Sequence, residues 1–437
     1  MNRLFIIDPS LKDIRGHHYM MTRAATLSAQ KQNFDVHWLC SKDFGGELMS
    51  DGATVAPTFS ASMYQNYMAK KEEAAPSFLQ RVVRRLTGGG AAAAPQKVDQ
   101  TAAFHADLLT AMKRFEIGAN DRLFLHTADG ASFLGIARIV AELPAEDLPV
   151  FHVATPYDPV GVMPNRDNAD DIAAALSSLN EKGLIDKKLF LYAENPYLAA
   201  HLAELWSIEV RPLDVPVYPN DPEKIERAKR FRRDTLGLDD DMFVIVSLGS
   251  ARMEKGFFLI PDVVRRTFEF AGGEDFPNAD PQKIKYVLHA SPQIVGRDPV
   301  IVKAIEKLEE MPSSQVSLML EPLSEEDYQS LLLASDVVLM PYNEKDYRVR
   351  GSTIVSEAVA AEKIIVAKDG SYPGKAAKDF GGETGALPIE MAKGVLKIAS
   401  AQEDYKARAA AYARDYIDAN GIDTYWRKCL ETERAQG

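Results

Sequence analysis

The sequence predicts an α/β protein with two domains, each built on a doubly wound parallel sheet. At 437 residues, the chain is longer than one hydrophobic core normally serves, so two domains of about 200 residues are expected. Short apolar segments alternate with helical segments, which is typical of parallel strands joined by right-handed crossovers. A proline-rich segment near the middle, after which the alternation starts again, separates the two halves.

Composition and charge are those of an ordinary globular protein, with 46% hydrophobic and 26% charged residues. No stretch approaches the roughly 18 apolar residues that cross a bilayer, and the start lacks a signal-peptide pattern. Cys40 and Cys429 lie near opposite ends of the chain, which fits a reducing cytoplasm better than a disulfide framework. The net charge of −12 argues against a nucleic-acid partner, because nucleic acids select basic surfaces.

The first half opens with a β–α–β unit, the start of a doubly wound sheet. We predict a strand over Leu4–Ile7, a helix from about His17 to Gln32, and a strand over Phe34–Leu39. Later elements repeat this order. The further predicted strands are Arg122–His126, Val150–Ala154 and Leu189–Tyr192, and the further helices are Ala131–Leu143 and Tyr197–Leu205.

Two segments interrupt the alternation. Ser60–Gln96 contains the basic amphipathic segment Phe78–Leu86 and a Gly/Ala run, Thr87–Pro95, typical of a flexible tether. We interpret Phe78–Leu86 as a solvated surface helix; contact with the inner face of a membrane or a lipid-linked acceptor is the alternative. Pro212–Pro222 contains four prolines, which resist both helix interiors and central strands, so we interpret it as the interdomain linker.

After this linker the pattern restarts and continues to the C-terminus. The predicted strands are Phe243–Leu248, Ile284–His289, Val316–Leu320, Val337–Met340 and Ile364–Ala367. The predicted helices are Glu223–Arg233, Phe257–Phe270, Val300–Glu310, Glu325–Leu333, Ser352–Ala361, Tyr405–Ile417 and Thr424–Arg434. We therefore expect an N-terminal domain over residues 1–213 and a C-terminal domain over residues 214–419.

The strongest local motif is Ser247-Leu-Gly-Ser-Ala-Arg-Met-Glu-Lys-Gly256, which follows a predicted strand and precedes a helix. Its glycines permit tight turns, and its two cations lie at the carboxyl end of a strand, where open α/β sheets bind ligands. Cations beside a helix N-terminus suit a diphosphate; a surface turn with solvated charges is the equal alternative for this motif alone. The candidate ligand-binding residues are Gly249, Ser250, Arg252 and Lys255.

A second motif follows the predicted strand Val337–Met340. Its candidates are Arg350, Gly351, Ser352, Thr353 and Glu357. The Gly-Ser-Thr segment can present backbone N–H groups and hydroxyls at a helix start. The glutamate lies about one turn further along, where a carboxylate can accept two hydrogen bonds from ribose. Together the motifs predict a nucleoside-diphosphate site in the second half.

At these residues the sequence resembles retaining GT-B glycosyltransferases, the "glycosyl transferases group 1" family. The resemblance implies two Rossmann-like domains facing across a cleft, with a nucleotide-sugar donor in the C-terminal domain and the acceptor in the N-terminal one. It implies that Arg252 and Lys255 hold the diphosphate and act in catalysis, that Glu357 binds ribose, and that Gly351, Ser352 and Thr353 contact the phosphates. It also implies that the last helix, about residues 420–437, crosses back to the N-terminal domain. The resemblance is specific across about Phe243–Ala367.

The sequence departs from the family pattern at several positions. The first Glu of an E-x7-E pattern would fall on Val349, and the glycine and proline after the motif helix are replaced by Glu362 and Ile364. The nearby polar candidates are Asp346, Arg348 and Arg350. We therefore expect a divergent subgroup whose sugar contact differs more than its nucleotide site.

Residues after the N-terminal strands are candidates for sugar and acceptor contacts. For His126 the resemblance implies a catalytic contact with the transferred sugar; a buried or capping histidine is the alternative. The candidate acceptor residues are Gly16, His17, His18, Asp129 and Tyr157. At Tyr157 a proline-fixed turn is an equal alternative.

No catalytic pattern for metal, nucleophilic or dinucleotide chemistry is present. The sequence lacks H-x-x-x-H and C-x-x-C spacings, a G-x-S-x-G elbow, a Walker A segment and an N-terminal G-x-G-x-x-G, and we interpret Asp239-Asp-Asp241 as a polar turn. Because basic side chains can neutralise a diphosphate, neither a metal nor another cofactor is expected.

We therefore expect a cytoplasmic, metal-independent glycosyltransferase, of the kind used in polysaccharide biosynthesis. It would move a hexose-type sugar with retention to a glycan, a lipid-linked glycan or another hydroxyl. One alternative is a degenerate GT-B protein that binds a nucleotide-sugar or a protein partner without turnover. The other is a GT-B nucleotide-sugar epimerase, for which the sequence offers no convincing set of carboxylates.

Overall fold

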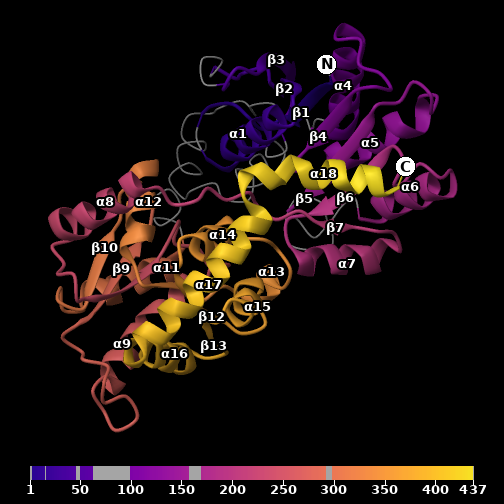
Figure 1. The fold of residues 1–437 in the computed structure, drawn as a ribbon. Coiled ribbons are helices and arrows are strands. Elements are labelled where there is room, and N and C mark those ends of the chain that lie inside the picture. The colour runs from indigo at the N-terminus through magenta and orange to yellow at the C-terminus, as the bar shows by residue number, and fades with distance from the viewer. Residues whose placement is uncertain are drawn as a thin grey trace, which may run out of the picture. The chain divides into compact units, whose positions relative to one another are not determined.

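The computed structural model describes residues 2–14, 16–45, 50–62, 99–156, 169–291 and 298–436. The chain forms two compact units, Met1–Asp214 with Ile422–Gly437, and Val215–Gly421. Each unit contains one parallel sheet (Figure 1), so the predicted α/β class with two Rossmann-like sheets is confirmed. Phe78–Leu86 and Tyr157 lie outside the described residues.

The first unit is a doubly wound sheet of order β3-β2-β1-β4-β5-β6-β7. Its strands are β1 (Asn2–Asp8), β2 (Phe34–Ser41), β3 (Thr54–Phe59), β4 (Arg122–Leu125), β5 (Val150–Thr155), β6 (Leu189–Ala193) and β7 (Arg211–Pro212). Its helices are α1 (Gly16–Lys31), α4 (Gln100–Arg114), α5 (Gly130–Glu142), α6 (Ala169–Glu181), α7 (Pro196–Trp206) and α18 (Ile422–Gln436). The winding reverses between β1 and β4, which pair directly. Ligands of such sheets bind outside the carboxyl ends of these two strands.

The two edge strands of this sheet, β3 and β7, are not predicted from the sequence. Each contains a proline, Pro57 in β3 and Pro212 in β7. Proline cannot donate to a strand ladder and is therefore confined to edges, which is where both strands lie. The segment interpreted as a linker thus begins with a residue of the sheet.

The second unit repeats this winding, with sheet order β10-β9-β8-β11-β12-β13. Its strands are β8 (Phe243–Ser247), β9 (Ile284–His289), β10 (Val316–Met319), β11 (Val337–Met340), β12 (Ile364–Lys368) and β13 (Glu383–Gly385). Its helices are α8 (Pro222–Arg230), the π-helix η3 (Phe231–Thr235), the 3-10 helix η4 (Phe257–Leu259), α9 (Ile260–Phe270), α11 (Pro299–Glu309), α12 (Glu325–Ala334), α13 (Glu344–Tyr347), α14 (Thr353–Ala360), α15 (Tyr372–Asp379), α16 (Pro388–Ser400) and α17 (Gln402–Asn420). The reversal point lies between the paired strands β8 and β11.

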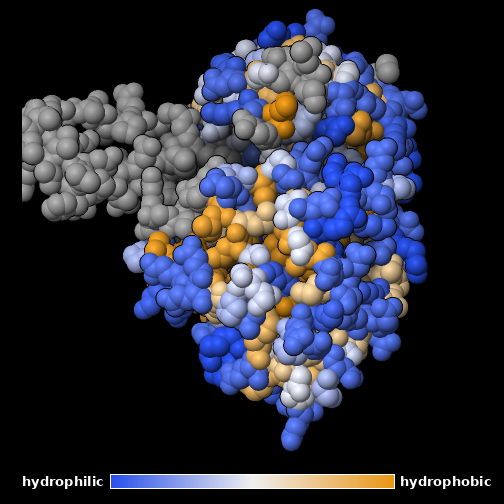
Figure 2. Space-filling view, turned by 90° about the vertical axis from the view of Figure 1, so that its left-hand side faces the viewer, coloured by the Kyte–Doolittle hydropathy of each residue, from blue (hydrophilic) through white to orange (hydrophobic). Residues whose placement is uncertain are grey.

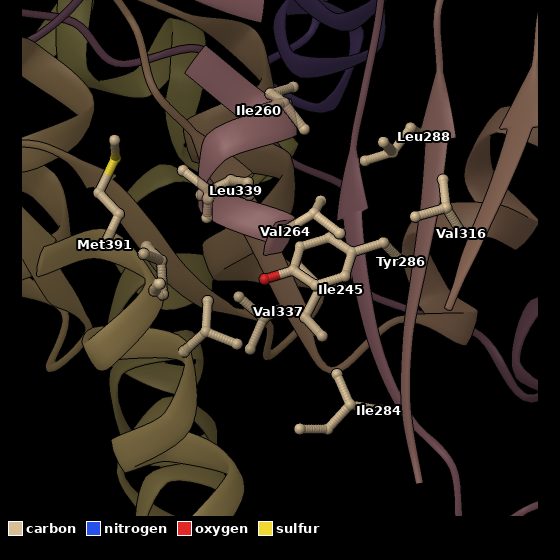
Figure 3. Close-up of a cluster of buried hydrophobic side chains, with 14 of the residues drawn as sticks. Ile245, Ile260, Val264, Ile284, Tyr286, Leu288, Val316, Val337, Leu339 and Met391 are labelled. Carbon is tan, nitrogen blue, oxygen red and sulfur yellow. The ribbon is translucent and has the colours of Figure 1, made fainter. Parts of the chain in front are cut away.

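The core of the second unit explains why its strands have continuous apolar sequences. Every residue of β8 and β9 is buried, as expected for a parallel sheet covered by helices on both faces. Figure 3 shows Tyr286 among aliphatic side chains such as Ile245 and Val264. Its hydroxyl is 2.7 Å from Thr267 Oγ1, so the buried phenol has a hydrogen-bond partner. This core anchors the loops that follow β8 and β11.

The last helix, α18, belongs to the first unit and packs along α1 (Figure 1). Trp426 is fully buried, and its ring lies 5.8 Å from that of Phe34 and 5.5 Å from that of Phe124. Arg122 Nη2 of β4 lies 2.6 Å from Glu433 Oε1. The C-terminal residues therefore complete the core of a sheet that the N-terminus begins.

The surface seen in Figure 2 is mostly hydrophilic, with apolar side chains exposed among the hydrophilic ones. Large apolar residues that are exposed include Ile225 and Val300, at 41% and 48%. Among the helices in the described ranges, none is long and apolar enough to cross a membrane.

Candidate functional site

The loop after β8 carries the first predicted motif, and its two glycines determine its path. Gly249 has φ +94° and Gly256 has φ +65°, values that favour glycine. A Cβ atom at residue 256 would lie 1.8 Å from the Pro341 carbonyl oxygen. The Asn343 N–H donates to the Glu254 carbonyl at 2.9 Å. The loops after β8 and β11 therefore meet at backbone distance, which brings the two motifs together.

Lys255 lies where these two loops meet. Its Nζ is 5.4 Å from the centroid of the Tyr342 ring, and a Cβ atom on Gly249 would lie 2.7 Å from the same Nζ. Burial lowers the pKa of Lys255 to about 8, and the charges of Arg252 and Arg350 act in the same direction. A partly buried ammonium beside two further cations is costly without a negative partner, so this position favours an anionic ligand.

The two arginines extend this positive region. Arg252 Nη1 lies 3.2 Å from Glu254 Oε1, and its buried Nε has no hydrogen-bond partner in the part of the chain that the structure describes. Arg350 lies over the Tyr347 ring, with Cζ 4.9 Å from the centroid. Tyr347 in turn packs on Tyr342, with 4.6 Å between ring centroids. The tyrosine pair thus links the arginine of the second motif to the lysine of the first.

Glu357 of α14 belongs to the same site as Lys255. The Tyr328 hydroxyl, from α12, donates to Glu357 Oε2 at 2.7 Å. Burial raises the pKa of Glu357 to about 7, whereas the Tyr328 hydrogen bond and the Lys255 charge act to lower it. The carboxylate assigned to ribose and the ammonium assigned to the diphosphate are therefore close enough to influence each other.

The Gly351-Ser352-Thr353 segment forms the start of α14, as the anion-site prediction requires. Ser352 is the N-cap residue, but its side chain makes no capping hydrogen bond. Its hydroxyl lies beside the Tyr342 phenol instead, and burial raises the pKa of that phenol to about 12. The positive end of the α14 dipole therefore lies at the second motif, and the serine side chain does not cap it.

The sequence-based candidates omit several side chains of this site, among them His289 and Tyr328. His289 ends β9, next to β8, and its Nδ1 accepts the Gly249 N–H at 3.3 Å. A histidine at a strand end is a signal that could have identified it, as it did for His126. Tyr328 gives no such signal, because it lies on a helix and only the fold brings α12 to Glu357.

The departures from the family pattern have separate structural outcomes. Val349, at the position of the first family Glu, is 6% exposed, so an apolar side chain fills that place. Glu362, which replaces a family glycine, has φ +60°. Its N–H donates to the Val359 carbonyl at 3.0 Å, and the Lys363 N–H donates to the Ala358 carbonyl at 2.8 Å, the pattern of a Schellman motif. The helix end keeps the left-handed backbone without the glycine.

In the first unit, Asp8 and His18 form a carboxylate–imidazole pair at the carboxyl end of β1. His18 Nδ1 lies 2.9 and 3.0 Å from the two Asp8 oxygens, and Asp8 also accepts the Ser10 N–H at 3.0 Å. Burial opposes ionisation of Asp8, but His18 and His126 hold its pKa well below the usual range. Burial lowers the pKa of His18, but Asp8 outweighs it and raises that pKa overall. The His18 side chain remains 14% exposed.

His126 and Asp129, at the carboxyl end of β4, are enclosed. The His126 side chain is 0% exposed, its Nε2 lies 2.8 Å from Thr22 Oγ1, and its Nδ1 lies 2.8 Å from Thr127 Oγ1. Asp129 is the N-cap of α5 and forms a capping box with Ser132. The structure thus gives both side chains partners within the first unit.

The remaining first-unit candidates surround the Asp8–His18 pair. Gly16 begins α1 with φ +76°. His17 lies edge-on to His18, with 6.0 Å between ring centroids. Burial, together with the charges of His18 and His126, lowers the pKa of His17 to about 3. Of the adjacent histidines, His18 is therefore the one whose ring can carry charge near neutral pH.

Within the described ranges, no group of three or more His, Cys, Asp and Glu side chains could hold a metal ion. The charged groups that act on Lys255 are mainly basic, Arg252 and Arg350, with Glu254 as the acid. The site can therefore neutralise a diphosphate with its own side chains.

Comparison with known proteins identifies the fold. No family model and no curated protein matches the sequence. A glycosyltransferase from Rickettsia africae has a TM-score of 0.64 at 13% identity, over 100% of this chain and 98% of that one. HepE from Anabaena, in complex with UDP and glucose, has a TM-score of 0.60 at 12% identity, over 100% of both chains. A UDP-forming trehalose-phosphate synthase from Burkholderia xenovorans has a TM-score of 0.62 at 12% identity, over 99% of both chains. The fold is GT-B.

In this GT-B chain, the candidate residues of each unit lie at the reversal point of its sheet. Asp8 and His126 follow β1 and β4, and the two motifs follow β8 and β11. This is where open α/β sheets bind ligands. Each unit therefore has one candidate binding region, and that of the second unit is rich in cations.

Proposed function

We propose that the chain is a glycosyltransferase that transfers a hexose-type sugar from a nucleotide-diphosphate donor to an acceptor hydroxyl, with retention. Lys255, partly buried and set among Arg252, Arg350 and Glu357, carries this proposal. It combines a cationic site for a diphosphate with a carboxylate for ribose. HepE has been solved with UDP-glucose, which makes UDP-glucose the first donor to test.

The proposed chemistry is a front-side displacement. The bond between the anomeric carbon and the diphosphate oxygen breaks, and its electron pair leaves with the nucleoside diphosphate. The acceptor oxygen bonds to the same face of the carbon and gives its proton to the leaving phosphate oxygen. Arg252, Lys255 and the start of α14 stabilise the charge that develops there, so positioning replaces a metal or another cofactor.

The acceptor would bind mainly to the first unit, near Asp8 and His18. The proposed acceptor is a glycan, a lipid-linked glycan or another hydroxyl compound. We propose that the enzyme acts in the cytoplasm, in polysaccharide biosynthesis. The segment Phe78–Leu86, interpreted as a solvated surface helix, is the candidate for peripheral membrane contact. Truncating it would test that alternative through vesicle co-sedimentation.

The competing functions make different demands on this site. An epimerase needs carboxylates able to move protons on the sugar ring, whereas Glu254 is paired with Arg252 and Glu357 is bonded to Tyr328. A degenerate binding protein would keep the diphosphate contacts without turnover. Transfer is therefore the function that uses both the cations of the second unit and the Asp8–His18 pair of the first.

The test is turnover of UDP-glucose, GDP-mannose and ADP-glucose with a mixture of glycan and lipid-linked acceptors. We expect release of nucleoside diphosphate and a product whose anomeric configuration, measured by NMR, matches the donor. Arg252→Ala and Lys255→Ala should each lower turnover at least tenfold, whereas Lys303→Ala, on the exposed face of α11, should not change it. Binding without turnover would favour the degenerate alternative, and equal turnover by all variants would place the site elsewhere.

A further inference from the structure

The contact between Tyr328 and Glu357 joins two helices that are distant in the sequence. Tyr328 lies on α12 and Glu357 on α14. The distance from the Tyr328 hydroxyl to Glu357 Oε2 is 2.7 Å, in a part-buried setting. The bond occupies one carboxylate oxygen, so the other, Oε1, is the oxygen that remains for a ligand.

While Glu357 is ionised, the phenol is the donor in this contact. Burial and the nearby Glu357 charge raise the pKa of Tyr328 well above its usual value, so the hydroxyl keeps its proton. Ribose also offers hydroxyl donors, and an ionised carboxylate can accept from them while it accepts from Tyr328. A protonated carboxyl would itself need an acceptor and would lose part of this capacity.

Several charged and titratable groups face Glu357 and determine its ionisation. Burial opposes the charged form, Glu325 of α12 opposes it further, and Lys255 favours it. The Tyr342 phenol, from the loop after β11, also senses the Glu357 charge. Tyr328 is the group that donates a hydrogen bond to the carboxylate directly, and hydrogen bonds to an ionised group are the stronger ones.

We propose that Tyr328 is a positioning residue for donor recognition, which keeps Glu357 ionised and directs its second oxygen toward the ribose hydroxyls. This inference rests on the proposed function, because it takes Glu357 as the ribose-binding carboxylate. It adds that donor affinity is linked to the ionisation of this carboxylate.

The linkage predicts a bell-shaped pH profile for donor affinity. The donor binds ionised Glu357, so affinity rises as the pH rises through the Glu357 pKa of about 7. The diphosphate binds protonated Lys255, so affinity falls as the pH rises through the Lys255 pKa of about 8. Removing the Tyr328 hydroxyl should move the acidic limb to higher pH and leave the alkaline limb in place.

The experiment measures the affinity of the full chain for UDP-glucose by calorimetry between pH 5.5 and 9.5. A nucleotide-sugar is the right probe, because its diphosphate lacks the terminal phosphate ionisation near a pKa of about 6. GDP-mannose and ADP-glucose are titrated in parallel, and the donor that binds most tightly is used for the variants. Tyr328→Phe is compared with Tyr286→Phe, which removes a hydroxyl of the same unit that is buried and bonded to Thr267 rather than to the site.

For Tyr328→Phe we expect the acidic limb to move up by about one pH unit. Affinity should then fall about tenfold at pH 6 and less than about threefold at pH 9. Tyr286→Phe should keep the wild-type profile, and Glu357→Gln should abolish the acidic limb and bind weakly at every pH. A uniform loss for Tyr328→Phe, or an unmoved acidic limb, would overturn this inference alone. If the wild type binds none of the three donors at any pH, the proposed function fails as well.

Discussion

Three histidines of the first unit are candidates from the sequence. They differ in burial, in hydrogen-bond partners and in the charge that each ring can carry. His126 bonds to two threonine hydroxyls and is fully enclosed. His17 is kept neutral by burial and by its charged neighbours. His18 is oriented through Nδ1 by the ionised Asp8, as an aspartate orients the histidine of a catalytic triad. The sequence places all three near a strand end, but only the packing separates their roles.

This difference predicts that two alanine variants differ in their effect on sugar transfer. His126→Ala should lower the free energy of unfolding by about 1–3 kcal/mol, because it removes hydrogen bonds to two buried hydroxyls. His18→Ala leaves the buried Asp8 without its imidazole partner, so it should also lower the free energy of unfolding, and it should lower glycosyl transfer at least tenfold. Chemical denaturation and transfer assays on the same preparations measure both effects. The assignment is wrong if His18→Ala transfers sugar at the wild-type rate while His126→Ala, folded at low temperature, does not.

The site residues of the second unit could be predicted only where their spacing in the sequence indicates them. Arg252, Lys255 and Glu357 stand at fixed positions after apolar strands, and the structure brings them into one site. Tyr328 and His289 act through contacts between elements distant in the sequence, which no local pattern encodes. Val349 is the opposite case. It stands where the first Glu of the E-x7-E pattern would fall, but it has no carboxylate.

At the scale of elements, the central strands and their helices could be predicted because burial on both faces leaves uninterrupted apolar runs. The predicted strands Ile284–His289 and Val337–Met340 match β9 and β11 residue for residue. The edge strands β3 and β7 escape prediction because their prolines are tolerated only at a sheet edge. The contact between the loops after β8 and β11 could not be predicted either, because this contact depends on the absence of a side chain at Gly256.

That loop contact predicts the effect of a single methyl group. Gly256→Ala would place Cβ 1.8 Å from the Pro341 carbonyl oxygen, so it should lower the free energy of unfolding by about 2 kcal/mol or more and weaken donor binding. Gly237→Ala is the matched control, because Gly237 has φ +64° with nothing within 4 Å of its added Cβ. It shares the backbone strain without the collision. Equal losses of stability for the two variants, measured by thermal unfolding, would show that the contact between the loops does not depend on this close approach.

At the scale of the whole molecule, two sheets with the same winding each present their candidate residues at the reversal point. Alternating strands and helices predict this winding, since parallel strands require crossovers. The sequence reports less about the first unit, whose core includes α18 from the opposite end of the chain. Its His152, stacked on Phe190 with 5.2 Å between ring centroids, carries no motif at all.

The proposed function depends on diphosphate binding by the loops after β8 and β11, through Lys255 and Arg252. Calorimetric titration of UDP, GDP and ADP into the wild type and the Arg252→Ala/Lys255→Ala double variant tests it most directly. We expect at least one nucleotide to bind the wild type, and the double variant to bind it about 10- to 100-fold more weakly, as the loss of charged hydrogen bonds implies. Equal affinity in a folded double variant would contradict the proposed function.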